Sequence, residues 1–488
     1  MTLSSSRLSR RRVYIATLIT VNSVVILSLI SFISRFGFGP TASFFLHHTS
    51  GTASRAIDYV HALEHSQPAL VQASTKWTPL SLSRCLFGMP AHYAPCLARR
   101  LPNTPIYAEE LVYPDFELRE PYFPSGEAGH AQREAWRHLV YTDPELQRAS
   151  LHGEWMSYKG QSGQNFVFAD AKYTRDTPQD SWRAEACMSY LVNTNPIHAL
   201  TPADFKDEKE KVFPTAIIAS SPDSYSFQHF LDRVAHVIAQ GKHLYPVTEE
   251  VYALTGRGAA NTVNEMWAAM GFPSERVLHQ SQTIAAERLV YSCRAVLVHP
   301  WLSLKTLEML GVDAQQAAPL AERRKVVYMT RSDGQAHNTG RRVLNEEEVI
   351  AAIEALLMER QQGEELVVFD PRNFHNITAL FSWFQQNVKA VVGPHGGAMI
   401  NHRWAPKDTF ILEFMPETRI ALMIYEEASL LSQTYAAIVV PPANLSSYDM
   451  NVEVEQVVQL LRAHLGREDK EDPLRRSYSW GGADLGLR

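Results

Sequence analysis

A glycine-rich loop that contains a histidine is the clearest chemical feature of the sequence. It reads Gly393-Pro-His395-Gly396-Gly397 and follows a β-branched run at residues 388–392, which predicts a buried strand. Helix-forming residues follow the loop and end before a proline, so a helix is expected to begin there. Backbone N–H groups at a helix N-terminus attract anions, and glycines let a ligand approach the backbone closely. The stretch therefore predicts a phosphate-binding turn.

Two more sets of polar residues follow predicted strands in the same half of the chain. Arg331 and Ser332 come after a strand at residues 326–329, and Glu413 lies in a strand at residues 409–414. Strands that alternate with helices predict a doubly wound parallel sheet, whose strand ends meet at the edge where ligands bind. We expect Arg331, Ser332 and the loop to hold a diphosphate and Glu413 to accept from ribose hydroxyls. A surface arginine and a core ion pair of Glu413 are the plainer alternatives.

A helix in the first half carries two residues that could move a proton. It follows a strand at residues 215–219 and runs from Ser224 or Ser226 to about residue 240. His229 and Asp232 lie on one side of its helical wheel together with Arg233 and His236, opposite the apolar side. A polar face that lines a cleft would bring these groups to a substrate, whereas an ordinary amphipathic helix would only expose them to water.

Composition and charge exclude some classes of function. The chain has 488 residues, 45% of them hydrophobic, and a formal net charge of −6, which is too mild to indicate binding to nucleic acid. No Gly-x-Ser-x-Gly elbow is present, which argues against a serine hydrolase. Residues 77–183 show poor periodicity and give only two possible strands, at residues 109–122 and 165–169.

The N-terminus predicts a membrane anchor. The segment from Val13 to Ile33 has no charged residue and is long enough to span a bilayer. Arginines at positions 7 and 10–12 precede it, so the positive-inside bias places the N-terminus in the cytosol and the rest of the chain in a lumen. A cleaved signal peptide is the competing interpretation. A Ser-, Thr- and Ala-rich stem follows.

The cysteines and sequons fit a lumenal location. All four cysteines follow the predicted anchor, which allows two disulfides with three possible pairings, and Cys85–Cys96 is the local candidate. Buried free thiols are the alternative. Sequons begin at Asn376 and Asn444, and Asn444 in its Pro-rich loop is the better candidate for glycosylation, because Asn376 also suits a helix cap.

Three motifs together resemble glycosyltransferase family 61. They are Ser226-Phe-Gln-His229-Phe-Leu-Asp232, the block Tyr328-Met-Thr-Arg331-Ser332 with Arg341-Arg-Val-Leu-Asn345-Glu-Glu, and Val391-Val-Gly393-Pro-His395-Gly396-Gly397-Ala to Glu413. They cover about residues 212–442 in the order of the family. Asp232 comes one residue earlier than the family pattern has it, and Gly397-Ala398 replaces Ala-Gly.

The resemblance implies a type II membrane protein of the Golgi or endoplasmic reticulum. It implies an α/β, GT-B-like fold with two Rossmann-like domains facing across a cleft, after the transmembrane helix and stem. The boundaries expected are a cytosolic tail at 1–12, the anchor at 13–33, a stem at 34–100, an acceptor-side domain at 101–315, a nucleotide-sugar domain at 316–442, and a C-terminal helix and tail at 443–488.

The resemblance also implies the reaction. The family transfers a sugar with inversion from a UDP-sugar, most often UDP-xylose or UDP-N-acetylglucosamine, to a hydroxyl of a glycoprotein or polysaccharide. No essential metal or other cofactor is expected, in keeping with the absence of an Asp-x-Asp pair at a predicted strand end. Inversion needs a general base, which we assign to His229 and Asp232. A lumenal glycan-binding pseudoenzyme is the alternative, because a fold does not fix a function.

Overall fold

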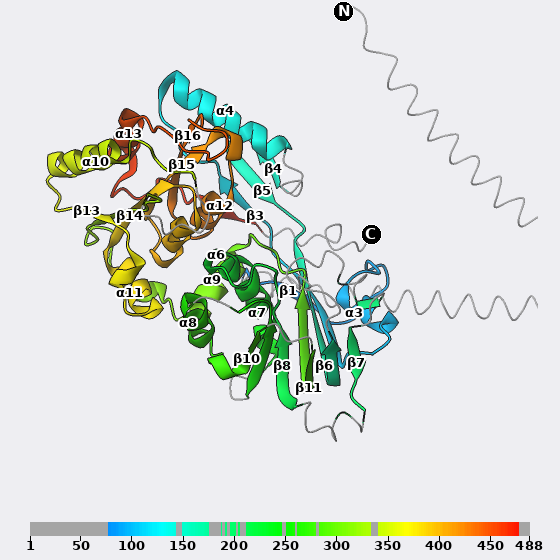
Figure 1. Ribbon diagram of the computed structural model, residues 1–488. Coiled ribbons are helices and arrows are strands. Elements are labelled where there is room, and N and C mark those ends of the chain that lie inside the picture. Colours follow the sequence, from blue (N-terminus) through cyan, green and yellow to red (C-terminus); the bar gives the residue numbers. More distant parts are fainter. Residues whose placement is uncertain are drawn as a thin grey trace, which may run out of the picture. The chain divides into compact units, whose positions relative to one another are not determined.

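Figure 1 shows the computed structural model, which describes residues 77–142, 149–174, 187, 191–192, 196–201, 204, 211–245, 250–258, 261–279, 283–332 and 340–477. The predicted tail, the predicted anchor and most of the predicted stem lie outside these residues. Within the described parts, none of the helices combines the length and the apolar character that a membrane span requires. All described elements belong to one compact unit, Ala73–Arg488.

The first sheet has eight strands and mixes parallel with antiparallel pairing. Its order is β1-β2-β6-β11-β8-β9-β10, with β7 beside β6. The parallel part is formed by β11, β8, β9 and β10, and the antiparallel edge by β1, β2 and β6. The strands are β1 Leu80–Leu82, β2 Tyr107–Val112, β6 Ser162–Thr174, β7 Ile197–Ala199, β8 Val212–Ile218, β9 Val251–Thr255, β10 Val277–His279 and β11 Thr283–Cys293.

The second sheet has five parallel strands in the order β13-β12-β14-β15-β16. The strands are β12 Lys325–Tyr328, β13 Glu365–Val368, β14 Val388–Pro394, β15 Phe410–Pro416 and β16 Thr434–Val440. The helices of this half are α10 Glu346–Arg360, α11 Ile377–Asn387, the 3-10 helix η8 Gly397–Trp404, α12 Met423–Leu430 and α13 Val454–His464. The predicted alternation of strands and helices, and the parallel sheet that it implies, are confirmed.

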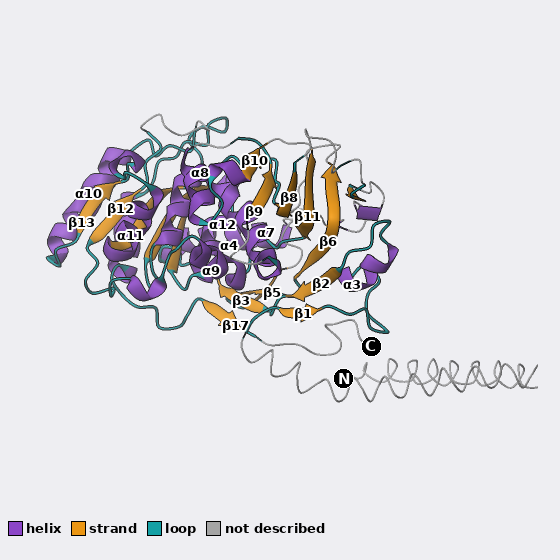
Figure 2. Ribbon diagram, turned by 90° about the horizontal axis from the view of Figure 1, so that it is seen from below, coloured by secondary structure: helices purple, strands orange, loops and turns teal. Residues whose placement is uncertain are grey.

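Alternation along the strands places most of their apolar side chains in three layers. On β15, Ile411 and Met415 belong to a core cluster that also contains Ile217 of β8, whereas Phe410 and Leu412 belong to another. Each sheet therefore has an outer layer of its own and shares the layer between them. Figure 2 shows helices α7 (Ala235–Gly241), α9 (Pro300–Met309) and α12 between the first and the second sheet.

A third, antiparallel sheet was not expected from the sequence. Its order is β17-β3-β5-β4, and it joins strand β17 at Leu474–Arg476 to strands β3 Phe116–Arg119, β5 Trp155–Tyr158 and β4 Ala149–His152. Helix α4, Gly126–Thr142, packs against β16, where the Gln132 side chain accepts a hydrogen bond from the Val439 backbone at 3.0 Å. Helix α4, from the predicted acceptor-side domain, therefore packs on the second sheet, and strand β17, from the predicted C-terminal tail, pairs with a strand of the acceptor-side domain.

The end of the predicted stem belongs to the folded unit. Strand β1 pairs with β2, and helix α3, Ala94–Leu97, is buried against the first sheet. A disulfide joins Cys85 to Cys96, and a second joins Cys187 to Cys293 across 106 residues of sequence. The local pairing is therefore confirmed, and all four cysteines are paired.

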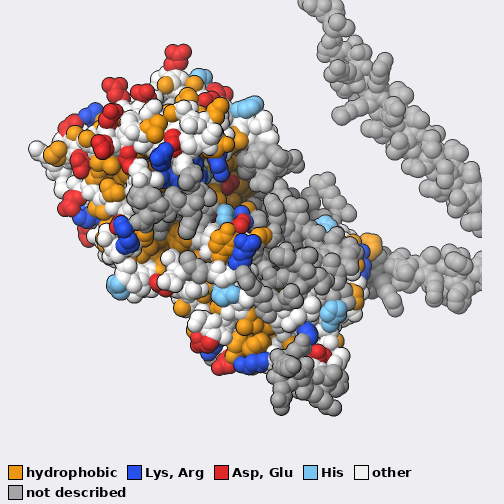
Figure 3. Space-filling model, viewed as in Figure 1, with side chains coloured by type: hydrophobic (Ala, Val, Ile, Leu, Met, Phe, Trp, Pro, Cys, Tyr) orange, Lys and Arg blue, Asp and Glu red, His pale blue; other side chains and the backbone are white. Residues whose placement is uncertain are grey.

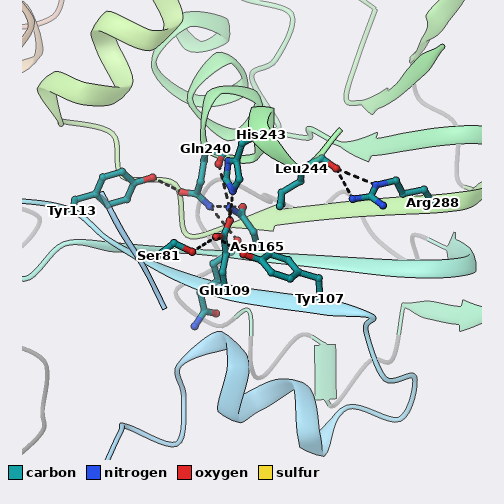
Figure 4. Close-up of polar contacts among 10 residues, drawn as sticks. Ser81, Tyr107, Glu109, Tyr113, Asn165, Gln240, His243, Leu244 and Arg288 are labelled. Atoms are coloured by element: carbon teal, nitrogen blue, oxygen red, sulfur yellow. Dashed lines mark hydrogen bonds and ion pairs between the residues drawn. The ribbon is translucent and has the colours of Figure 1, made fainter. Parts of the chain in front are cut away.

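A buried polar network ties the first sheet to the end of α7 (Figure 4). The fully buried Glu109 accepts hydrogen bonds from Tyr107 at 2.9 Å and from Asn165 at 2.8 Å, and it also bonds Ser81. Its Oε1 atom lies 2.5 Å from Nε2 of His243, which follows α7. Every carboxylate oxygen thus has a donor, as a buried charge requires.

Candidate functional site

The glycine loop is held tightly between two neighbouring strands. Gly393 pairs with Glu413 near the end of β14, and a Cβ on Gly393 would lie 2.5 Å from the Met329 carbonyl oxygen after β12. The His395 backbone donates to the Phe414 carbonyl at 2.9 Å, which fixes the loop to β15. The helix that follows is a 3-10 helix, in which Asn401 binds the Ala398 carbonyl at 2.9 Å. The strand–loop–helix order is as predicted, although the helix is more tightly wound than an α-helix.

Arg331 reaches this loop. Its Nη1 atom lies 2.3 Å from the position that a Cβ on Gly396 would occupy, so the guanidinium rests directly against the glycine. Its Nε donates to the Gly340 carbonyl at 2.8 Å. Burial and then the charge of Arg419 lower the pKa of Arg331. The predicted meeting of Arg331 with the glycine loop is present, and the next residue, Ser332, is exposed.

Two further arginines, Arg341 and Arg419, lie close enough to Arg331 to interact with it electrostatically. Neither was proposed for the site from the sequence. Burial, and then the charges of Arg331 and Arg419, lower the pKa of Arg341 to about 10. Arg419 follows β15 in a short 3-10 turn at Glu417–Arg419. Figure 3 shows the face seen in Figure 1, on which Lys and Arg side chains occur in several separate groups among hydrophobic ones. Arg341 stood in the quoted motif, whereas only its position just after a strand could have singled out Arg419.

Glu413 is fully buried and already paired. Its Oε1 lies 2.5 Å from Nδ1 of His395, and its Oε2 accepts from the Tyr435 hydroxyl. These side chains come from the adjacent strands β14, β15 and β16 and their ends, so the register of the sheet aligns them. Burial and then the charge of Glu413 raise the pKa of Tyr435. The core pairing that the sequence left open is present, and a ribose contact by Glu413 stays a prediction.

The predicted catalytic helix begins as expected. The Ser226 hydroxyl accepts from the His229 backbone at 3.3 Å and caps α6, Phe227–His229. A π-helical segment, Phe230–Val234, follows and leads into α7. Such π-turns occur frequently at functional sites. Nδ1 of His229 lies 3.6 Å from Oδ2 of Asp232, and both side chains are partly exposed.

The prediction that His236 belongs to the polar face of this helix is wrong. His236 is fully buried, and its Nδ1 lies 3.0 Å from the Val296 carbonyl oxygen. Burial lowers the pKa of His236 to about 3, so the ring is neutral at physiological pH. The π-turn changes the helical spacing that the wheel assumed, and α9 packs against α7, so this face is not solvated as a whole.

The start of the catalytic helix touches the loop region of the second half. A Cβ on Gly397 would lie 3.6 Å from Oε1 of Gln228, the residue before His229. The Gln228 amide contacts the Met423 sulfur of α12 at 2.6 Å, and the Phe227 ring lies 6.3 Å from that of Trp404 at the end of η8. The structure therefore brings the first motif next to the glycine loop.

The asparagines have several roles. The Asn376 side chain accepts from the Ala379 backbone at 2.8 Å and caps α11, so its alternative role as a cap is confirmed. Asn345 precedes α10 without a side-chain cap, because its amide instead bonds both backbone groups of Val452 at 2.9 Å. Asn444 is exposed. Glycosylation at Asn376 and Asn444 stays a prediction.

One family model matches a stretch of the sequence that contains most of the residues described above. Residues 227–412 match the glycosyltransferase 61 family, a stretch that runs from the start of α6 into β15 and includes His229, Arg331 and the glycine loop. The match confirms the resemblance seen in the motifs and supports a glycosyltransferase. No curated protein matches the sequence.

The solved structures found by comparison are only weakly similar to this chain. Two mutants of a flavo di-iron protein from Thermotoga maritima align with 48% of this chain, at 9% and 10% identity and TM-scores of 0.21 and 0.20. The aligned part spans 51% of those chains, about half their length.

Within the described residues of the present protein, no three His, Cys, Asp or Glu side chains are grouped to hold a metal ion.

Proposed function

We propose that the protein is an inverting glycosyltransferase that moves a sugar from a UDP-sugar to a hydroxyl group of a glycoprotein or polysaccharide. The observation that carries the proposal is the contact of the Arg331 guanidinium with Gly396 at the carboxyl edge of the parallel sheet. A cation and a glycine turn at the start of a helix suit a diphosphate at this edge. The family match over residues 227–412 supports the same reaction class.

The chemistry divides between the two halves of the unit. The acceptor oxygen forms a bond to the anomeric carbon while the bond from that carbon to the diphosphate oxygen breaks, and its electron pair leaves with UDP. Arg331 and the loop stabilise the negative charge that develops on the leaving diphosphate. The proton of the acceptor hydroxyl passes to His229, whose ring is paired with Asp232 at 3.6 Å.

The GT-B-like arrangement belongs to the same proposal. The helix that carries His229 starts beside Gly397, so the base and the diphosphate site come from different halves of the unit. Sites between such halves are common for ligands of this size. Because arginines supply the positive charge at the diphosphate, we propose that transfer needs no resident metal ion or other cofactor. UDP-xylose and UDP-N-acetylglucosamine are the first donors to test.

The proposed location is the lumen of the Golgi or endoplasmic reticulum, with the segment from Val13 to Ile33 as a type II anchor. Two disulfides in the folded unit support an oxidising compartment. Protease added to sealed microsomes should spare the residues after the anchor and digest them only once detergent is present. Digestion without detergent would contradict the proposed topology.

A donor screen tests the proposed activity. The purified full chain is incubated with single UDP-sugars and candidate acceptors, and both UDP release and the anomeric configuration of the product are measured by NMR. We expect one or two donors to be consumed, with inversion at the anomeric carbon. Retention would contradict the single displacement. Glycan binding without turnover of any UDP-sugar would instead favour the glycan-binding pseudoenzyme.

A further inference from the structure

We infer that Arg341 and Arg419 complete, with Arg331, a three-arginine cluster that selects nucleoside diphosphates over nucleoside monophosphates. The inference rests on the proposed function, because it assigns new residues to the same donor site. The glycine loop alone does not indicate either residue. Both contact the loop at residues 444–450 instead.

Backbone contacts fix Arg341 in place. The Arg341 N–H donates to the Ser447 carbonyl at 2.7 Å. A Cβ on the preceding Gly340 would lie 2.0 Å from the same oxygen, and the Gly340 carbonyl accepts the bond from Arg331. Residues 340–341 therefore join Arg331 to the 444–450 loop.

The backbone of Arg341 is strained. Its φ is +59°, in the left-handed region that a residue with a Cβ rarely adopts. Strain of this kind persists where the surrounding structure enforces it, and it is concentrated at binding and catalytic sites. The side chain is also only 7% exposed, so a long cation is held in a fixed and largely dry position.

Arg419 arrives at the same loop from the other side. Its guanidinium carbon lies 5.3 Å from the centre of the Tyr448 ring, next to the Ser447 that binds Arg341. Stacking on an aromatic face orients a guanidinium without neutralising its charge. Arg331, Arg341 and Arg419 thus reach one place from three separate segments of the chain.

Two carboxylates that act on the cluster, Asp449 and Glu413, are each bound to other groups. Asp449 is held by Arg342, with an Nη2–Oδ2 distance of 2.9 Å, and Glu413 is held by His395 and Tyr435. After the larger effect of burial, the charge of Arg419 lowers the pKa of Arg331, and the charges of Arg331 and Arg419 lower the pKa of Arg341, whereas Asp449 and Glu413 act in the opposite direction. Like charges that act on one another favour the binding of an anion, and an anion with two phosphate groups can accept from several guanidinium groups at once.

Arg342 provides a matched control. It is adjacent to Arg341 in sequence, but its side chain is 54% exposed and paired with Asp449. Because the left-handed backbone of residue 341 suits glycine, Arg341→Gly removes the cation without adding backbone strain. The variants Arg341→Gly, Arg419→Ala and Arg342→Ala therefore separate the proposed cluster from nearby positive charge.

The experiment is a calorimetric titration of the full chain and each variant with UDP and with UMP. We expect Arg341→Gly and Arg419→Ala each to lower UDP affinity about 10- to 100-fold, the value of a charge-assisted hydrogen bond, and to lower UMP affinity much less. Arg342→Ala should leave both affinities within about twofold, because the Arg342 side chain is 54% exposed and the buried Asp449 keeps the backbone N–H of residue 342 as a donor at 2.9 Å. A circular-dichroism melt of each variant identifies any that has lost its fold.

The possible failures are distinguishable. An unchanged ratio of UDP to UMP affinity in both folded variants overturns the inference, even where Arg331→Ala abolishes UDP binding and the proposed function stands. If Arg341→Gly loses its fold, the ratio of UDP to UMP affinity in Arg419→Ala decides alone. If neither variant folds, the same ratio is measured for Arg419→Lys, which keeps the charge and loses the planar fork. Absence of UDP binding by the wild-type chain overturns both the function and the inference.

Discussion

Replacing Gly396 by alanine should displace Arg331 without harming the fold. The new Cβ would lie 2.3 Å from Nη1 of Arg331 and 3.4 Å from its Cζ, so the guanidinium has to move. The backbone of Gly396 is extended, with a φ of 171°, and alanine adopts that conformation freely. The atom that must give way is the end of a long side chain, so the cost falls on the position of the arginine.

The expected loss follows from the contacts that Arg331 makes with the diphosphate in the proposed site. A hydrogen bond to a charged group contributes about 1.5–3 kcal/mol, so a displaced guanidinium lowers UDP affinity about 10- to 100-fold. Gly397 is the matched comparison, because a Cβ there meets only Oε1 of Gln228 at 3.6 Å, an ordinary contact. Gly397→Ala should therefore weaken UDP binding much less than Gly396→Ala.

A double-mutant cycle tests whether the glycine acts through the arginine. UDP affinity is measured by calorimetry for Gly396→Ala, Arg331→Ala and the double variant, with thermal melts as a control for folding. Because both changes remove the same contact, the double variant should bind UDP about as well as Arg331→Ala alone. Losses that add, or wild-type affinity in Gly396→Ala, would refute the reasoning.

Three further predictions concern catalysis, the core and pH. His229→Ala and Asp232→Asn should each lower kcat about 10²- to 10⁴-fold, the usual contribution of a general base, with UDP affinity little changed; full turnover in both would remove this pair from the mechanism. Glu413→Ala should lower the free energy of unfolding by about 3–5 kcal/mol in a denaturant titration, because it leaves the buried Tyr435 hydroxyl and the partly buried His395 ring without their partner, and a loss below about 0.5 kcal/mol would contradict this. Burial raises the pKa of Glu109, but the hydrogen bond and charge of His243 with the other donors outweigh this, so its net pKa is lowered. That stabilisation is present above the unfolded value of 4.5 and is lost as the pH falls through the folded value. His243→Ala should therefore move acid unfolding to higher pH, and an unchanged acid midpoint would argue against the pair shown in Figure 4.

The sequence predicted the second half of the chain well because its signals are local. Short β-branched runs such as residues 388–392 and 409–414 alternate with helices and are bounded by glycine or proline, so strand ends could be placed to within a few residues. Since parallel strands end at one edge, the meeting of Arg331 with Gly396 followed from topology.

Features that depend on distant pairing were missed. In the third sheet, Leu474 pairs with Leu118, and no periodicity within either short strand indicates such a partner. Arg341 and Arg419 are connected through the 444–450 loop, whose Ser447 carbonyl accepts from the Arg341 N–H and whose Tyr448 ring lies beside Arg419, and a linear pattern does not encode these contacts. The burial of His236 depended on a π-turn that a regular helical wheel does not anticipate.

The most direct measurement is a crystal structure of the full chain or of Ala73–Arg488 grown with UDP. The account predicts the diphosphate within hydrogen-bond distance of the Arg331 guanidinium and of the backbone N–H groups of Gly396 and Gly397. A diphosphate bound elsewhere, with Arg331 and Gly396 making no contact to it, would contradict the central claim.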